Sequence, residues 1–143
     1  MRNTPKNQQG MMMIEALVGI LIFSFGILAM MGLQAISIKN TIEAKYRTEA
    51  SFAANKIIAE MWTECGVTCT TLNSFDTTSG TNAKMTEWRT DVAALLPGVV
   101  VSGTNSPTIQ VVGNTVTVTV FWKIPGTDST VRNFSTIAQI NAS

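Results

Sequence analysis

The feature that most constrains this chain is a run of 23 residues, from Ala16 to Ile38, without a charged side chain. As a helix rising about 1.5 Å per residue it would span about 34 Å, enough for a bilayer core of about 30 Å. A buried core helix is one alternative, but core helices rarely run this long without a polar stripe. A cleaved secretory signal is another, but its apolar region is usually about 7–15 residues long and a small-residue site follows it. We therefore expect a retained transmembrane segment, which covers residues 11–38 together with the apolar residues before the run.

The charges that flank this segment indicate its orientation. Arg2 and Lys6 precede it and no acidic residue does, so the positive-inside bias keeps the N-terminus in the cytoplasm. Three basic residues between positions 39 and 47 oppose this bias. The predicted topology is a single pass that exports residues 39–143 as a globular domain.

A single carboxylate, that of Glu15, interrupts the apolar stretch 11–38 after four residues. An unpaired carboxylate costs about 2.5–3.5 kcal/mol at the centre of a membrane helix and less near its edge. One interpretation places Glu15 at the membrane surface as a solvated charge, which also suits a helix N-terminus. The other is that Glu15 awaits a cation from a second chain, because ionisable residues within membrane segments are functional candidates.

The order of features around Glu15 resembles the class III signal of type IV prepilins and pseudopilins. A short basic leader is followed by Gly10, four apolar residues, Glu15 and a long apolar helix. The resemblance implies a leader of residues 1–10, cut after Gly10 by the prepilin peptidase, and N-methylation of the new N-terminus at Met11. Glycine leaves no side chain to clash in the peptidase site. The family most often has Phe where this chain has Met11, and translation from Met11 without a leader is the alternative.

The same resemblance implies a role for Glu15 in subunit assembly. In a helical filament, the Glu15 carboxylate of an incoming subunit would face the cationic methylated amine of Met11 on a neighbour. Removing one partner of a buried charge pair leaves an uncompensated charge, so such a pair sets register and direction.

Several short tracts further along the chain resemble the PilV class of minor pilins. They are Gly32-Leu33-Gln34-Ala35, Tyr46-Arg47, Ala53-Ala54-Asn55-Lys56-Ile57-Ile58, and the stretch from Glu87-Trp88-Arg89 to Leu96-Pro97-Gly98. The apolar half also lacks the proline that usually interrupts it in major pilins, which points weakly to a minor component.

Periodicity predicts one long helix over about residues 12–63, apolar on all sides in its first half and amphipathic in its second. The apolar positions of the second half recur at spacings of three or four: Ile42, Tyr46, Ala50, Ala53, Ile57 and Met61. Glu43–Arg47 and Lys45–Glu49 are predicted as ion pairs one helical turn apart. A loop is predicted at 70–83 and a short helix at about 85–95, anchored in the core by Trp88.

The last third of the chain changes to the period of β-strands. Apolar residues alternate with Thr and Phe from Thr115 to Trp122, and Gly113-Asn114 joins this strand to another at 108–112 as a hairpin. Further strands are predicted at 99–102 and 130–140, with a turn at 124–127. The expected fold is therefore α+β, a pilin fold in which a C-terminal antiparallel sheet of three or four strands packs on the amphipathic half of the helix.

Cys65 and Cys69 are separated by four positions directly after the predicted helix. This separation allows the two sulfurs to meet across a turn, and an exported, oxidising location favours a disulfide. The spacing differs from the redox Cys-x-x-Cys motif. Two reduced, half-buried thiols are the alternative.

Composition argues against several classes of function. The chain has ten Lys and Arg against nine Asp and Glu, and this near-neutral balance argues against a nucleic-acid-binding protein. There is no His, two Cys cannot alone form a four-ligand zinc site, and no Gly-rich phosphate loop or nucleophile–base pair stands out. We therefore expect no enzymatic activity, no cofactor and no bound metal.

The function expected from these residues and resemblances is that of a minor pilin that primes assembly of a type IV pilus at its tip. Its expected partners are the prepilin peptidase, other minor pilins, the major pilin and a tip adhesin. Its expected location is the inner membrane, with the C-terminal domain in the periplasm, and then the pilus on the cell surface. A minor pseudopilin of a type II secretion system and a membrane-anchored binding domain that never polymerises are the alternatives.

Overall fold

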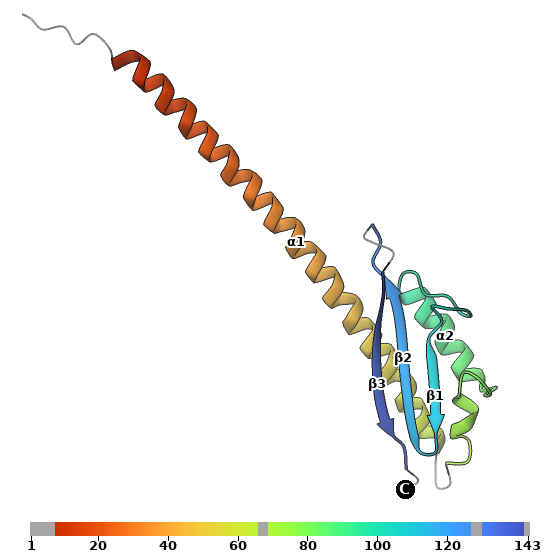
Figure 1. The fold of residues 1–143 in the computed structure, drawn as a ribbon. Helices are drawn as coiled ribbons and strands as arrows, with labels where there is room; N and C mark the ends of the chain where they lie inside the picture. The colour runs from red at the N-terminus through yellow and green to blue at the C-terminus, as the bar shows by residue number, and fades with distance from the viewer. Residues whose placement is uncertain (1–7, 66–68, 127–129, 142–143) are drawn as a thin grey trace, which may run out of the picture. The chain divides into compact units, whose positions relative to one another are not determined.

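The computed structural model describes residues 8–65, 69–126 and 130–141, drawn as a coloured ribbon in Figure 1. The predicted leader falls mostly on residues 1–7, which lie outside the described residues, as does the end of the turn predicted at 124–127. The chain divides into two units, residues 1–41 and 42–143. One helix, α1 (Gln8–Cys65), contributes to both, and the remaining elements belong to the second unit.

In the first unit, α1 is exposed at every position from Gly10 to Thr41. Two of its hydroxyl groups form hydrogen bonds to backbone carbonyls of the same helix. The Ser24 hydroxyl donates to the carbonyl oxygen of Ile20 at 2.7 Å, and the Thr41 hydroxyl donates to that of Ser37 at 2.9 Å. Such bonds lower the cost of placing a hydroxyl in an apolar environment. The helix is long and apolar enough to cross a membrane.

In the second unit, α1 buries one side against the rest of the domain. The predicted three- and four-residue spacing is confirmed from Ala50 onward, and Ile42 and Tyr46 are half-buried. The buried positions of α1 are Ala50, Ala53, Ala54, Ile57, Met61 and Cys65. These side chains share one apolar cluster with the inward-facing residues of the sheet. Figure 1 shows the second part of α1 behind the strands.

Three antiparallel strands form the sheet, in the order β1-β2-β3. Their bounds are β1 (Thr108–Val112), β2 (Thr115–Lys123) and β3 (Val131–Gln139). The alternation predicted for the central strand is confirmed, since Val116, Val118, Val120 and Trp122 are all buried. The two-residue turn between β1 and β2 is also confirmed. Gly113 has a φ of 61°, a value that glycine adopts without steric cost.

A short helix and a 3₁₀ turn complete the domain. The predicted helix is confirmed as α2 (Ala83–Leu95), and Asn82 caps it by accepting a hydrogen bond from the Lys84 amide. Trp88 is buried, as predicted, and its indole Nε1 donates to the carbonyl oxygen of Ala53 at 2.8 Å. This bond joins α2 to α1. Residues 70–83, predicted as a loop, contain the 3₁₀ turn η1 (Leu72–Phe75), whose Phe75 is fully buried.

The strand predicted at 99–102 is wrong. Gly98 and Gly103 both have positive φ angles and bracket an irregular segment in which Val100 and Val101 are exposed. The hydroxyl of Ser106 donates to the carbonyl oxygen of Val101 at 2.9 Å, so this segment bonds as a turn. The prediction relied on three consecutive valines, which are common in strands. These residues lack the alternation of apolar and polar side chains that marks a paired strand.

One of the two predicted ion pairs within α1 is also wrong. Lys45 and Glu49 form theirs at 3.7 Å, but Glu43 pairs with Arg132 of β3 at 2.8 Å and not with Arg47. Arg132 presents a planar guanidinium in a half-buried position, where a hydrogen-bonded ion pair is stronger than an exposed pair along a helix.

Replacing Ile57 should test the packing of α1 on the sheet, because Ile57 is 0% exposed. We expect Ile57→Ala to lower the free energy of unfolding by about 2–5 kcal/mol through lost burial and the resulting cavity. Ile137→Ala, at a position 70% exposed, is the matched control and should change it by no more than about 0.5 kcal/mol. Urea unfolding of the full chain in detergent micelles, followed by tryptophan fluorescence, measures both. Equal effects would contradict this packing.

Candidate functional site

The residues predicted to direct processing and assembly all lie near the start of α1. Gly10 and Met11 fall in the first turn of the helix, where backbone amides lack acceptors within the helix. A side chain built on Gly10 would meet no atom within 4 Å, and Met11 is 75% exposed. The bond between these two residues is therefore unobstructed by the described residues.

Glu15 lies on α1 in the same exposed stretch. Among the residues that the structure describes, none forms a hydrogen bond or an ion pair with its carboxylate. Met11 and Gly19 lie one turn before and one turn after Glu15 on the same side of the helix. The carboxylate thus stands between an apolar side chain and a position with no side chain, on an otherwise apolar helix surface.

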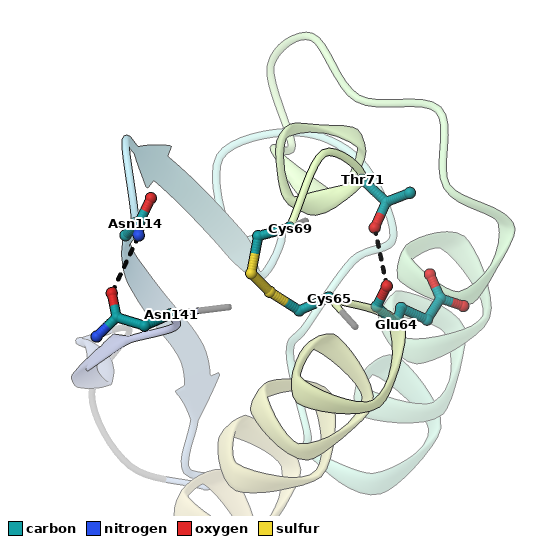
Figure 2. The surroundings of a disulfide bond; sticks show 6 residues. All are labelled: Glu64, Cys65, Cys69, Thr71, Asn114 and Asn141. Carbon is teal, nitrogen blue, oxygen red and sulfur yellow. Dashed lines mark hydrogen bonds between the residues drawn. A yellow bond between two sulfur atoms is a disulfide. The ribbon is translucent and has the colours of Figure 1, made fainter. Parts of the chain in front are cut away.

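Cys65 and Cys69 are joined by a disulfide at the end of α1 (Figure 2). Cys65 is the last residue of the helix and is buried, and Cys69 is half-buried; residues 66–68 between them lie outside the described residues. The Cys69 amide donates to the carbonyl oxygen of Cys65 at 2.8 Å. The Thr71 hydroxyl donates to that of Glu64 at 3.1 Å. Two of the last carbonyl groups of α1, those of Glu64 and Cys65, therefore find their partners in the segment that follows the helix.

The side chain of Glu64 connects this helix end to the start of α2. Its carboxylate accepts hydrogen bonds from Lys84 Nζ at 2.8 Å and from Asn82 Nδ2 at 3.1 Å. The bond from Lys84 is the main cause that lowers the pKa of Glu64, and the same bond raises the pKa of Lys84. Sequence reasoning did not find this cluster, although Asn82 has the residue type of a helix cap.

Asp76 holds the loop after η1 against the sheet. Its Oδ2 accepts from the Val111 amide at 2.9 Å, and its Oδ1 accepts from the amides of Thr78 and Ser79 at 2.8 and 3.3 Å. The bond from the Val111 amide is the main cause that lowers the pKa of Asp76. Sequence reasoning treated this stretch as a simple connector. The order Asp-Thr-Thr-Ser-Gly was the available signal, because Asp often bonds to backbone amides two residues ahead in a turn.

Two grooves lie on the surface formed by the described residues of the domain. A groove of about 350 Å³ lies between α1 and α2, with Phe52 and Leu95 on its walls and the Lys56–Asp91 ion pair, 2.8 Å long, beside it. A second groove of about 250 Å³ beside β1 is lined mainly by threonines. Within the described residues, no group of three or more His, Cys, Asp or Glu side chains is placed to hold a metal ion.

Comparison with protein-family models, with curated proteins and with solved structures finds no match for this chain.

The lowered pKa values of Glu64 and Asp76 predict that the domain loses stability in acid. A carboxyl whose pKa is lower in the folded chain stabilises the fold fully above its ordinary pKa, here 4.5 for Glu64 and 3.8 for Asp76. That contribution disappears as the pH falls through the folded-state pKa. We expect the free energy of unfolding to decrease from about pH 5 to about pH 3, and Asp76→Asn with Glu64→Gln to weaken this dependence.

Urea unfolding at several pH values, for the unchanged chain and for the double variant, measures this effect. The variant removes the titration with little change in shape. It leaves one oxygen acceptor where each carboxylate used two, so it should be less stable at every pH, and only the slope of stability with pH is compared. The same pH dependence in both proteins would show that other groups cause the acid sensitivity.

Proposed function

We propose that this chain is a minor pilin of a type IV pilus, held in the inner membrane before its incorporation into the filament. One observation carries the proposal: the exposed, apolar first part of α1 has a single carboxylate, Glu15, without a partner among the described residues. The α+β domain of residues 42–143 has its own core. An apolar helix of this kind needs either lipid or other helices around it.

The carboxylate favours a helical assembly over a simple anchor. A permanent anchor gains nothing from a charge inside an apolar segment, because the charge only lowers its affinity for lipid. A filament core of packed helices supplies a second chain at a fixed register. There the amine of a processed Met11 on a neighbour is the complementary cation, and its attraction to Glu15 selects the subunit register.

Processing at Gly10 would create that cation. Cleavage after Gly10 by the prepilin peptidase leaves Met11 as the N-terminus, and methylation of its nitrogen keeps the positive charge. Support comes from the unobstructed position of this bond in the first turn of α1, where fraying opens the backbone most easily. The partners proposed for the processed chain are the other minor pilins and the major pilin, with a tip adhesin as a further partner.

The proposed topology places the second unit in the periplasm and later on the pilus. The Cys65–Cys69 disulfide is compatible with this, since disulfides persist in oxidising compartments such as the periplasm.

Mass spectrometry of filaments sheared from cells tests the proposed function. The expected result is a chain that begins at N-methyl-Met11 and is scarce relative to a major subunit. A chain that keeps Met1, or one cut beyond Ala35, would overturn the proposal. Recovery in a secretion pseudopilus and not in surface pili would assign the chain to a type II secretion system.

Replacing Glu15 should separate membrane anchoring from assembly. We expect Glu15→Gln and Glu15→Leu to be processed at Gly10 as usual and retained in the membrane, with Glu15→Leu the better anchor. Incorporation into filaments should fall by more than about tenfold, because the neighbour's amine loses its buried partner. Quantitative immunoblotting of sheared filaments against membranes measures this ratio.

Ser24→Ala is the matched control for these variants. It removes a polar side chain from the same apolar segment, but one whose hydroxyl already bonds to Ile20 within the helix. It should enter filaments as the unchanged chain does. Filament recovery of Glu15→Gln equal to that of Ser24→Ala would contradict the proposed role of the carboxylate.

A further inference from the structure

The two edge strands of the sheet, β1 and β3, differ in whether another segment of the chain covers them. The edge of β1 is closed by the loop after η1: the Thr77 amide donates to the carbonyl oxygen of Ile109 at 2.9 Å, and the Val111 amide donates to Asp76 Oδ2. The outer edge of β3 has no such cover among the described residues. β3 is nine residues long, against five in β1, so the longer edge is the open one.

The register shows which backbone groups face this open edge. A two-residue turn makes Val112 and Thr115 a hydrogen-bonded pair, so every second residue of β2 from Thr115 bonds toward β1 and the others bond toward β3. Their partners in β3 are the even-numbered residues from Arg132 to Ala138. The amides and carbonyls of Val131, Asn133, Ser135, Ile137 and Gln139 therefore point away from the sheet.

The closed edge confirms this reasoning independently. By the same alternation, Ile109 and Val111 are the β1 residues whose backbone groups point outward. These are the two residues that bond to Thr77 and Asp76.

The core is also incompletely covered beside β3. The inward-facing residues of β2 are fully buried, whereas their neighbours Phe134, Thr136 and Ala138 are only half-buried. One more strand beside β3 would cover these side chains.

Within the described residues, the edge strand β3 has no lysine, proline or bulge, and its one protective feature is the inward-facing charge of Arg132. Exposed edges normally carry lysines, prolines or bulges that block another strand. The only charged residue of β3 is Arg132, and its guanidinium is bound to Glu43 at 2.8 Å. The side chains that flank the open backbone groups are uncharged.

We propose that the open edge of β3 binds an extended segment of a different polypeptide, which adds a fourth strand to the sheet. The partner segment has apolar side chains at alternate positions, which cover Phe134 and Ala138, and polar side chains between them. Main-chain hydrogen bonds to the five outward residues hold it, and the alternate apolar contacts set its register.

A second copy of β3 fits this edge less well. An antiparallel pair of β3 strands centred on Ser135 would place Arg132 beside Ala138 and Phe134 beside Thr136, by the symmetry of the pairing. In this register, which pairs all nine residues of both strands, half-buried apolar side chains meet polar ones. A register centred on Thr136 brings Phe134 beside Ala138 but pairs only seven residues of each strand. The different polypeptide is therefore the occupant that the edge favours.

Photo-crosslinking in cells tests the proposal without assuming that the chain enters a filament. A photoreactive amino acid is placed in turn at Asn133, Ser135 and Ile137, and at Thr117 of the central strand as the control. We expect the three β3 positions to crosslink to one segment of another protein, with the crosslinked residue shifting by two for each step of two along β3. Thr117 should not give this series.

Every outcome of this experiment is informative. No crosslinks, or crosslinks without a regular shift, would overturn the proposal. Crosslinks between two copies of this chain would replace the proposed partner with self-pairing. If the chain is absent from filaments but the regular series forms in membranes, the proposed function fails and the strand-binding edge stands.

A backbone substitution separates the edge from the side chains. Ser135→Pro removes one outward-facing amide without removing a bond to β2, and proline is tolerated on the solvent side of edge strands. Ser135→Ala is the matched control, because both variants lose the bond between the hydroxyls of Ser135 and Thr119. We expect Ser135→Pro to lower the crosslink yield at Asn133 and Ile137 by about tenfold relative to Ser135→Ala.

Circular dichroism and urea unfolding establish that both variants are folded. An equal crosslink yield from the two folded variants would show that the outward amide does not bind a partner strand. If Ser135→Pro does not fold, Asn133→Lys takes its place with the photoreactive amino acid at Ile137, since an edge lysine blocks strand addition while leaving the β2–β3 ladder intact.

Discussion

The domain of residues 42–143 depends on the contact between the buried side of α1 and the central strand of the sheet, which share one apolar cluster. Ala50, Ala53 and Ala54 are buried in one apolar cluster with the valines of β2. Ile57 and Met61 extend this contact toward the end of the helix. Trp88 then joins α2 to the same side through its bond to Ala53. The sheet, α2 and the second part of α1 therefore pack around one apolar core.

The elements with a clear period were predictable from the sequence. The amphipathic spacing after Lys39, the Val/Thr alternation of β2 and the Gly113-Asn114 turn each depend on neighbours in sequence, and the structure has all three. The strand predicted at 99–102 failed because valine content without alternation says little about pairing. The disulfide followed from the proximity of two cysteines and their predicted compartment.

Contacts between distant residues were not predictable in the same way. Glu43 meets Arg132 across 89 positions, and the nearer Arg47 offered an equally plausible partner until the register of β3 was known. Asp76 and Val111 are likewise brought together only by the tertiary fold. The roles of Gly10, Met11 and Glu15 remain predictions. These roles are interactions with a peptidase and with other subunits, and the fold of a single chain does not contain those partners.

Because α1 and β2 are far apart along the chain, they are synthesised at different times. During synthesis Ile57 emerges about sixty residues before Val118, so the apolar side of α1 is complete while the strands that cover it do not yet exist. Trp88 and the rest of α2 arrive in that interval and reach the same side of α1. η1, with its buried Leu72 and Phe75, and then α2 are therefore the first elements that can cover the apolar side of α1 before the strands are synthesised.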